Sequence, residues 1–138
     1  VERLEGMGIR RYEISNFARP GRESLHNLKY WKLEPYVGFG ADAHSFDGAG
    51  RWANAESIDE YLKQAPAART AAGPDERLFL GLRLSEGVRP TELEWRTHAE
   101  AIRRFVDCGL LESRDGALRL TGRGVLLSNE VFQEFLAA

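Results

Sequence analysis

Apolar residues recur at helical spacing most clearly between residues 92 and 108 of the chain. Thr91 and Glu94 stand three positions apart just before this pattern, which is the spacing of a capping box at a helix start. Gly109 follows the pattern and suits the left-handed position that often ends a helix. We therefore predict one helix here, with a buried face that carries Trp95, Ala99, Ile102, Phe105 and Val106.

Two short apolar runs follow this helix, at residues 110–113 and 117–120. Asp115 and Gly116 lie between them, and an Asp-Gly pair between apolar runs is a strong signal for a β-hairpin. Thr121 then begins a closing helix, because a threonine side chain can accept a free backbone N–H of the first turn. The buried side of that helix is predicted to carry Val125, Leu126, Val131, Phe132, Phe135 and Leu136.

A further apolar helix is predicted at residues 78–84, with Asp75 as its N-cap. Residues 74–138 then follow the order helix, helix, hairpin, helix, which is that of a winged-helix-like domain. A linker of small residues at 67–73 precedes it. We place a domain boundary there, which divides the chain into residues 1–73 and 74–138.

The first 73 residues show shorter patterns. Residues 1–8 look like the last turns of a helix that ends at glycines, and residues 9–15 look like a β-strand. Such a strand normally has parallel neighbours, and this part of the chain has room for few. We therefore interpret residues 1–73 as the end of a truncated domain. The remaining predicted segments are a helix between Ser24 and Pro35, a strand at 36–39, a loop at 47–52 and a helix at 58–65 begun by a capping box of Ser57 and Glu60.

The charge and composition of the chain argue against nucleic-acid binding and against association with a membrane. The net charge of −2 and an isoelectric point near 6.0 give no basic footprint for nucleic acid or an anionic membrane. A DNA-binding winged helix would need a basic second helix, but residues 92–107 carry four acidic side chains against three basic ones. No apolar run approaches the roughly 18 residues of a membrane span, and no leader is visible, so we expect a cytoplasmic protein.

The single cysteine, Cys108, excludes an internal disulfide. One thiolate also cannot hold a Cys-only zinc site or an iron–sulfur cluster. We expect Cys108 and His44 to be buried and His98 to be exposed. No spacing of hydroxyls, carboxylates and histidines indicates a catalytic triad, so the residues alone do not show an enzyme.

The segment HNLKYW is the first candidate for a ligand site. On a helix, His26 and Tyr30 fall at i and i+4, as do Asn27 and Trp31, so two polar–aromatic pairs lie on adjoining faces. His26 could ligate heme iron or another metal while the aromatic rings flank a flat macrocycle. The alternative is a structural histidine, and the residue chemistry by itself favours that alternative.

The segment GFGADA is the second candidate. Gly38, Gly40 and Ala43 match the GxGxxA form of the dinucleotide fingerprint, but a fingerprint must open a helix and no helical period follows Ala43. Dinucleotide binding is therefore disfavoured. The alternative is a strand whose glycines avoid clashes with neighbouring groups.

Four segments carry a family resemblance: YEISNFARPG, HNLKYW, YVGFGADAHSF and LRLTGRGVLLSNEVFQEFL. In this order they resemble the C-terminal part of the oxygen-independent coproporphyrinogen III oxidase-like radical SAM proteins, nearest to the HemW heme chaperone branch. The resemblance implies an α+β chain. Residues 1–73 would be the terminal strand-helix remnant of a radical SAM partial barrel, followed at 74–138 by a winged-helix-like C-terminal domain.

The resemblance also implies site residues and cofactors. The family's HNxxYW pattern, associated with heme in the chaperone branch, falls on His26, Asn27, Tyr30 and Trp31, with His26 as ligand to the heme iron. The glycine strand near the SAM and substrate side falls on Gly38, Gly40, Ala43 and Ser45. The family's CxxxCxxC loop is absent here. S-adenosyl-L-methionine and a [4Fe-4S] cluster are therefore expected in the full-length parent only, and the fragment is predicted to be inactive alone.

Our leading hypothesis is a fragment of a HemW-like heme chaperone that binds heme and delivers it to acceptor proteins. The first alternative is a fragment of coproporphyrinogen III oxidase, which decarboxylates two propionates to vinyl groups in porphyrin biosynthesis. The second is a non-enzymatic winged-helix interaction module. The expected partners are the missing N-terminal barrel portion, a heme acceptor protein and, through exposed strand edges, further copies of the chain.

Overall fold

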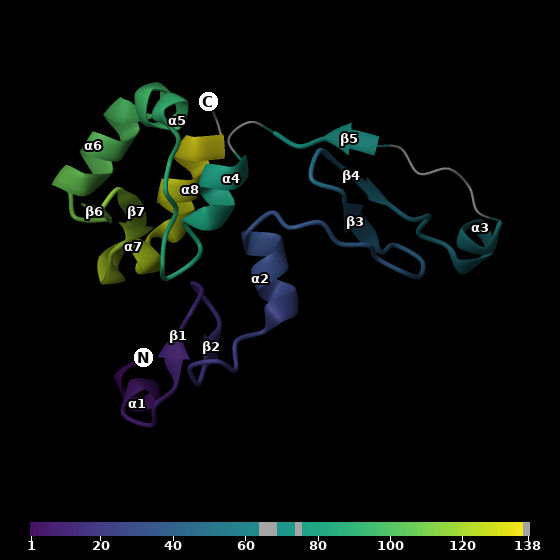
Figure 1. Ribbon diagram of the computed structural model, residues 1–138, viewed down its shortest axis with the longest axis horizontal. Coiled ribbons are helices and arrows are strands. Elements are labelled where there is room, and N and C mark those ends of the chain that lie inside the picture. The colour runs from purple at the N-terminus through teal and green to yellow at the C-terminus, as the bar shows by residue number, and fades with distance from the viewer. Residues whose placement is uncertain (64–68, 74–75, 137–138) are drawn as a thin grey trace.

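The computed structural model describes residues 1–63, 69–73 and 76–136. Short antiparallel strands alternate with helices, so the fold class is α+β, as predicted. In Figure 1 the helices after residue 76 group together, the strands β3 to β5 extend away from them, and α2 lies between the two. The helices are α1 (Glu2–Glu5), α2 (Leu25–Trp31), α3 (Ile58–Leu62), α4 (Glu76–Gly81), α5 (Glu92–Thr97), α6 (Ala99–Asp107), α7 (Gly122–Leu126) and α8 (Ser128–Leu136). The strands are β1 (Arg10–Arg11), β2 (Phe17–Ala18), β3 (His44–Phe46), β4 (Gly50–Ala53), β5 (Arg69–Ala71), β6 (Leu111–Arg114) and β7 (Ala117–Leu120).

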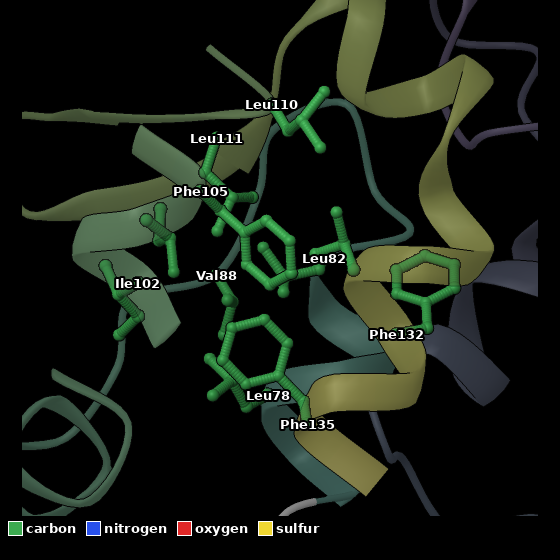
Figure 2. Close-up of a cluster of buried hydrophobic side chains, with 11 residues drawn as sticks. Leu78, Leu82, Val88, Ile102, Phe105, Leu110, Leu111, Phe132 and Phe135 are labelled. Carbon is green, nitrogen blue, oxygen red and sulfur yellow. The ribbon is translucent and has the colours of Figure 1, made fainter. Parts of the chain in front are cut away.

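One hydrophobic core holds the C-terminal part together, and Figure 2 shows its side chains meeting between α4, α6, α8 and the β6–β7 hairpin. Trp95 packs against this core from its edge. Val106 and Leu126 were predicted to be buried, but they are 37% and 84% exposed because α6 and α7 turn those positions outward. The core residues are Leu78, Leu82, Val88, Ile102, Phe105, Leu110, Leu111, Leu118, Val131, Phe132 and Phe135. The burial predicted for Leu136 lies outside the described side chains.

The helix predicted over 92–108 is two helices, α5 and α6, which meet at His98. The capping box at the start is confirmed, since Thr91 and Glu94 accept each other's backbone N–H groups. His98 was predicted to be exposed, but it is 3% exposed. Its ring meets the edge of Phe135 with centroids 5.2 Å apart, so the break in the helix turns the imidazole inward towards α8.

The predicted hairpin is confirmed, with Leu111 opposite Leu120 and positive φ angles of 52° and 75° at Asp115 and Gly116. Thr121 begins the closing helix as expected, because its hydroxyl accepts the backbone N–H of Gly124. That helix is also two helices, α7 and α8, separated at Leu127.

The strand predicted at 9–15 shrinks to β1, which pairs antiparallel with β2. The residues after β1 pair instead with the loop that follows α4. The N–H of Ile14 donates to the Arg83 carbonyl at 3.0 Å, and the N–H of Ser85 donates to the Tyr12 carbonyl at 3.0 Å. The beginning of the chain is therefore attached to the C-terminal part through backbone hydrogen bonds.

The prediction of a strand at 36–39 is wrong, because only Tyr36 forms a bridge there, with Phe46. Strand β4 lies where a loop was expected and β5 where a linker was expected, and with β3 they form an antiparallel sheet in the order β3-β4-β5. The turn between β3 and β4 is fixed by Asp47, whose carboxylate accepts the N–H groups of Ala49 and Gly50. These hydrogen bonds lower the pKa of Asp47, although the side chain is open to water.

The other predicted helices are present with shifted bounds. Ser24 caps α2 and Ser57 caps α3, each by accepting the N–H three residues on. The helix predicted at 78–84 is α4, and the cap predicted at Asp75 lies outside the described residues. The domain boundary at residue 73 and the winged-helix-like classification stay predictions. Among the described helices none is long and apolar enough to cross a membrane.

Candidate functional site

Helix α2 presents His26 at the surface. The imidazole is exposed and meets the ring of Tyr30, one helical turn on, edge-on at 4.9 Å with an interplanar angle of 86°. The predicted i, i+4 pair is therefore formed. The edge contact restricts the imidazole on one side, while the residue as a whole is exposed to solvent.

A row of aromatic rings continues from Tyr30 onto the sheet. Tyr30 and Tyr36 are 4.3 Å apart, Tyr36 and Phe46 are 6.3 Å apart, and the guanidinium of Arg51 lies 4.7 Å from the centre of the Phe46 ring. Burial raises the pKa of Tyr36, with Arg51 opposing the shift, so its hydroxyl keeps its proton near neutral pH. Arg51 also pairs with Glu76 at 2.7 Å, which joins this aromatic row to α4.

Trp31 does not lie with His26. Its ring packs against the Arg83 guanidinium at 4.1 Å, and Arg83 pairs with the fully buried Glu13 at 2.9 Å. Trp31 therefore anchors α2 to the C-terminal part, while Asn27 is half-buried on the adjoining helix face. The structure thus separates Trp31 from the His26–Tyr30 pair, and of the four residues predicted for heme only His26 is exposed.

The glycine segment is held by its own hydrogen bonds. The N–H of Gly38 donates to the hydroxyl of the buried Ser45 at 3.0 Å, and the Asn54 side chain donates to the Gly40 carbonyl at 2.8 Å. A Cβ on Gly38 would come within 2.3 Å of the His44 carbonyl oxygen, and Gly40 has a φ of 103°. Gly38 therefore fits the predicted alternative of close approach, whereas Gly40 has open space around it and is favoured by its positive φ.

The same segment carries exposed apolar side chains. Val37 is 63% exposed and Phe39 is 85% exposed, while Ala43 is half-buried behind them. His44 was expected in the core, but it is exposed, because the buried positions of β3 are Ser45 and Phe46. Uncovered apolar surface of this kind suits a ligand or a further protein segment.

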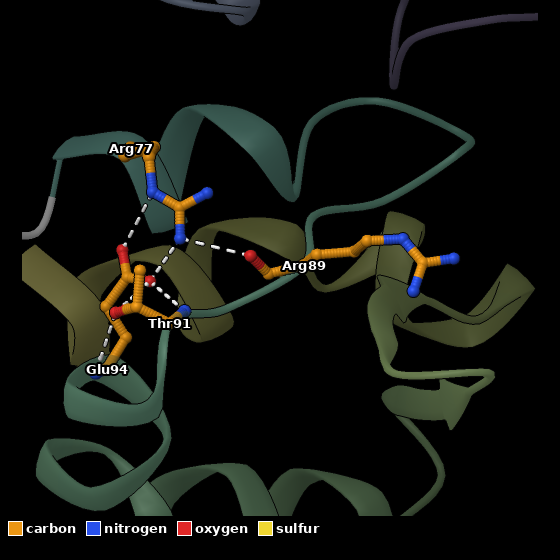
Figure 3. Close-up of polar contacts among 4 residues, drawn as sticks. All are labelled: Arg77, Arg89, Thr91 and Glu94. Atoms are coloured by element: carbon orange, nitrogen blue, oxygen red, sulfur yellow. Dashed lines mark hydrogen bonds and ion pairs between the residues drawn. The ribbon is translucent and has the colours of Figure 1, made fainter.

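A second polar cluster belongs to the capping box of α5 (Figure 3). Arg77 donates to both carboxylate oxygens of Glu94 and to the Arg89 carbonyl. Burial raises the pKa of Glu94, but the hydrogen bonds from Thr91 and Arg77 outweigh it, so the pKa lies below its ordinary value. This cluster ties α4 to α5, and its partners are already satisfied.

Across the described ranges 1–63, 69–73 and 76–136, no three His, Cys, Asp or Glu side chains gather as a metal site. Cys108 was expected to be buried, but it is exposed at the end of α6. The exposed imidazole of His26 would suit heme iron, because the porphyrin itself supplies four nitrogen ligands. The donor set therefore fits heme better than a bare metal ion.

Comparisons with known proteins place the chain in a family. Residues 74–127 match the HemN C-terminal domain. The chain is 37% identical over 153 residues to the heme chaperone HemW of Bacillus subtilis, covering 99% of this chain and 40% of that protein. It is 36% identical to the heme chaperone HemW of Mycobacterium tuberculosis, covering 97% of this chain and 37% of that protein.

A solved structure agrees with the fold. The chain superposes on the coproporphyrinogen III oxidase HemN of Escherichia coli, described as a radical SAM enzyme, with a TM-score of 0.67 and 19% identity. The likeness covers 97% of this chain and 38% of that one. From the sequence matches, the chain belongs to the family of the HemN C-terminal domain and the HemW heme chaperones. Within that family it is similar to the HemW heme chaperones, and it spans about two fifths of the length of these relatives.

Several residues that shape the site have no signal in the sequence. Tyr36, Arg51 and Arg83 contact α2 or its aromatic row, and local sequence patterns do not indicate these contacts, because each joins separate segments of the chain. Glu13 and Arg83 are 70 positions apart, so only the folded chain shows that they pair.

Proposed function

We propose that this chain is the C-terminal part of a cytoplasmic heme chaperone that binds heme through His26 and delivers it to an acceptor protein. The observation that carries the proposal is the exposed His26 imidazole, positioned by Tyr30 on a helix, in a chain similar to proteins named heme chaperones. Coproporphyrinogen III oxidase activity rests on a likeness of fold at 19% identity, and we do not propose it.

The residues of the chain would divide the work of holding heme. The neutral imidazole of His26 would ligate the iron, and the aromatic row would give apolar surface for the edge of the macrocycle. Phe39, which is 85% exposed, offers further apolar contact. S-adenosyl-L-methionine and a [4Fe-4S] cluster would be held by other parts of the full-length protein, with Gly38, Gly40, Ala43 and Ser45 nearest to them.

An exposed single ligand suits a protein that must release its cargo. An acceptor can approach the iron on the side that His26 does not occupy, so the heme can change ligands without unfolding the donor. Binding through one imidazole should also weaken in acid, because the proton competes with the metal for the ring nitrogen.

The test is a heme titration followed by the Soret band, in the 138-residue chain and in the full-length protein. His26→Ala should change the shape of the band and weaken binding by about tenfold or more, since a ligand bond to iron is lost. His44→Ala is the matched control, because His44 is also exposed. His98 is buried and is unsuitable as a control. Unchanged spectra and affinity in His26→Ala would remove this residue as the ligand.

A further inference from the structure

A hollow separate from the aromatic row lies where the end of α2 meets the C-terminal part. Its volume is about 510 Å³, within the range of pockets that bind small organic ligands. It is lined by Trp31 at the end of α2 and the following Lys32, by α4 and the loop after it, and by Ala117 of β7. Neither the heme ligand nor the glycine segment lines this hollow.

The polar lining is predominantly cationic, with Lys32, Arg77 and Arg89 against one carboxylate, that of Glu86. Lys32 pairs with Glu86 at 3.0 Å, and Arg77 is paired with Glu94. Arg89 donates from Nη1 to the Asp115 carbonyl at 2.6 Å. Figure 3 shows its guanidinium extending away from Arg77 and Glu94, so it contributes positive charge and further N–H donors to the hollow.

Trp31 lines the same hollow. Its indole N–H is shielded from solvent, and no side chain or carbonyl in the described part of the chain accepts it. The ring itself is fixed against Arg83 at 4.1 Å. Buried N–H groups in folded proteins almost always have an acceptor, but this one has no surface open to the hollow, so it is not a donor to a ligand there.

We propose that the hollow binds a carboxylate carried on an apolar body, with the Arg89 guanidinium as its donor. A carboxylate only accepts hydrogen bonds, which matches a wall of donors. The apolar lining from Gly81, Leu84 and Val88 favours an organic acid over a hydrated inorganic phosphate.

Two sources of this chemistry are a propionate of a tetrapyrrole and an unrelated aromatic acid. In the first case the inference rests on the proposed function and gives the chain a second point of contact with its cargo. In the second case the hollow has a ligand of its own.

The experiment uses ligands without iron, so that its outcome does not depend on His26. Binding of protoporphyrin, protoporphyrin dimethyl ester and 2-naphthoate is measured by fluorescence titration. We expect a free acid to bind about tenfold more tightly than the ester, and Arg89→Gln to remove that advantage. Arg103→Gln is the control, because it removes the same charge from the exposed face of α6.

Trp31→Phe is a second control. It keeps an aromatic ring against Arg83 and removes only the shielded N–H, so acid binding and the melting temperature should both stay near those of the parent chain. If Arg89→Gln weakens the binding of protoporphyrin, the group bound in the hollow is a propionate. If it weakens the binding of 2-naphthoate alone, the ligand is an unrelated aromatic acid. The proposal is overturned if acid and ester bind equally, if neither acid binds, or if Arg103→Gln weakens binding as much as Arg89→Gln. Loss of heme ligation in His26→Ala with unchanged protoporphyrin binding would show that the two sites act separately.

Discussion

The buried ion pair between Glu13 and Arg83 gives the sharpest test of how the two parts of the chain are joined. Glu13 is fully buried, and its carboxylate accepts from Arg83 at 2.9 Å and from the side chains of Ser15 and Asn16. Glu13→Gln keeps the shape of the side chain and removes the charge. The change leaves the Arg83 cation, 20% exposed, without its carboxylate.

The expected cost follows from these contacts. Removing one partner of a buried ion pair costs about 3–5 kcal/mol, because the other charge stays desolvated. Glutamine keeps one acceptor oxygen, and the Arg83 guanidinium still packs on Trp31 at 4.1 Å and near Phe132 at 6.0 Å. We therefore expect Glu13→Gln to lower the free energy of unfolding by about 2–3 kcal/mol.

Urea denaturation measures this change. Glu86→Gln is the matched control, because the Lys32–Glu86 pair is at the surface with side chains 40% and 65% exposed, and it should cost less than about 1 kcal/mol. Adding Arg83→Met to Glu13→Gln should recover part of the loss, since no unpaired charge remains. If Glu13→Gln costs less than about 0.5 kcal/mol, the pair does not join the two parts and the reasoning is wrong.

Three further outcomes are expected, each with an internal control. Ile102→Ala should lower the unfolding free energy by about 2–5 kcal/mol in urea, whereas Val106→Ala, on the exposed side of α6, should cost less than about 1 kcal/mol. The folded pKa of Glu94 lies below its ordinary value. The ionised carboxylate therefore stabilises the fold above the unfolded pKa of about 4.3, and this stabilisation is lost as the pH falls through the folded pKa. In thermal melts, Glu94→Gln should remove this contribution to the loss of stability in acid. Gly124→Ala should lower the melting temperature, since a Cβ there would lie 1.9 Å from the Leu110 carbonyl oxygen, while Gly122→Ala, with open space, should not.

The parts of the fold that could be predicted are those whose conformation is set by residues close together in the sequence. The Thr91–Glu94 capping box and the Asp115–Gly116 turn each act over a few positions, and both are present. The helix break at His98 was missed because apolar periodicity continues through it. The contact of that imidazole with Phe135, which comes from α8, accompanies the break and has no local signal.

The sheet was missed for a related reason. Strand β4 contains Arg51 and Trp52 beside glycine and alanine, so it lacks the alternation that predicts a strand, and its pairing with β3 and β5 defines it. The spacing of HNLKYW did predict that His26 and Tyr30 would meet. It did not predict that Trp31 would face Arg83, because that partner is far along the chain.

The hydrogen bonds between residues 12–14 and 83–85 also set an order of events in folding. Glu13 is synthesised 70 positions before Arg83, so its carboxylate stays hydrated until the loop after α4 has left the ribosome. Contacts within the β6–β7 hairpin and between neighbouring helices close much shorter loops and form faster. Attachment of the N-terminal segment is therefore a late step of folding, and before it the partly folded chain exposes a backbone edge that chaperones or other chains can bind.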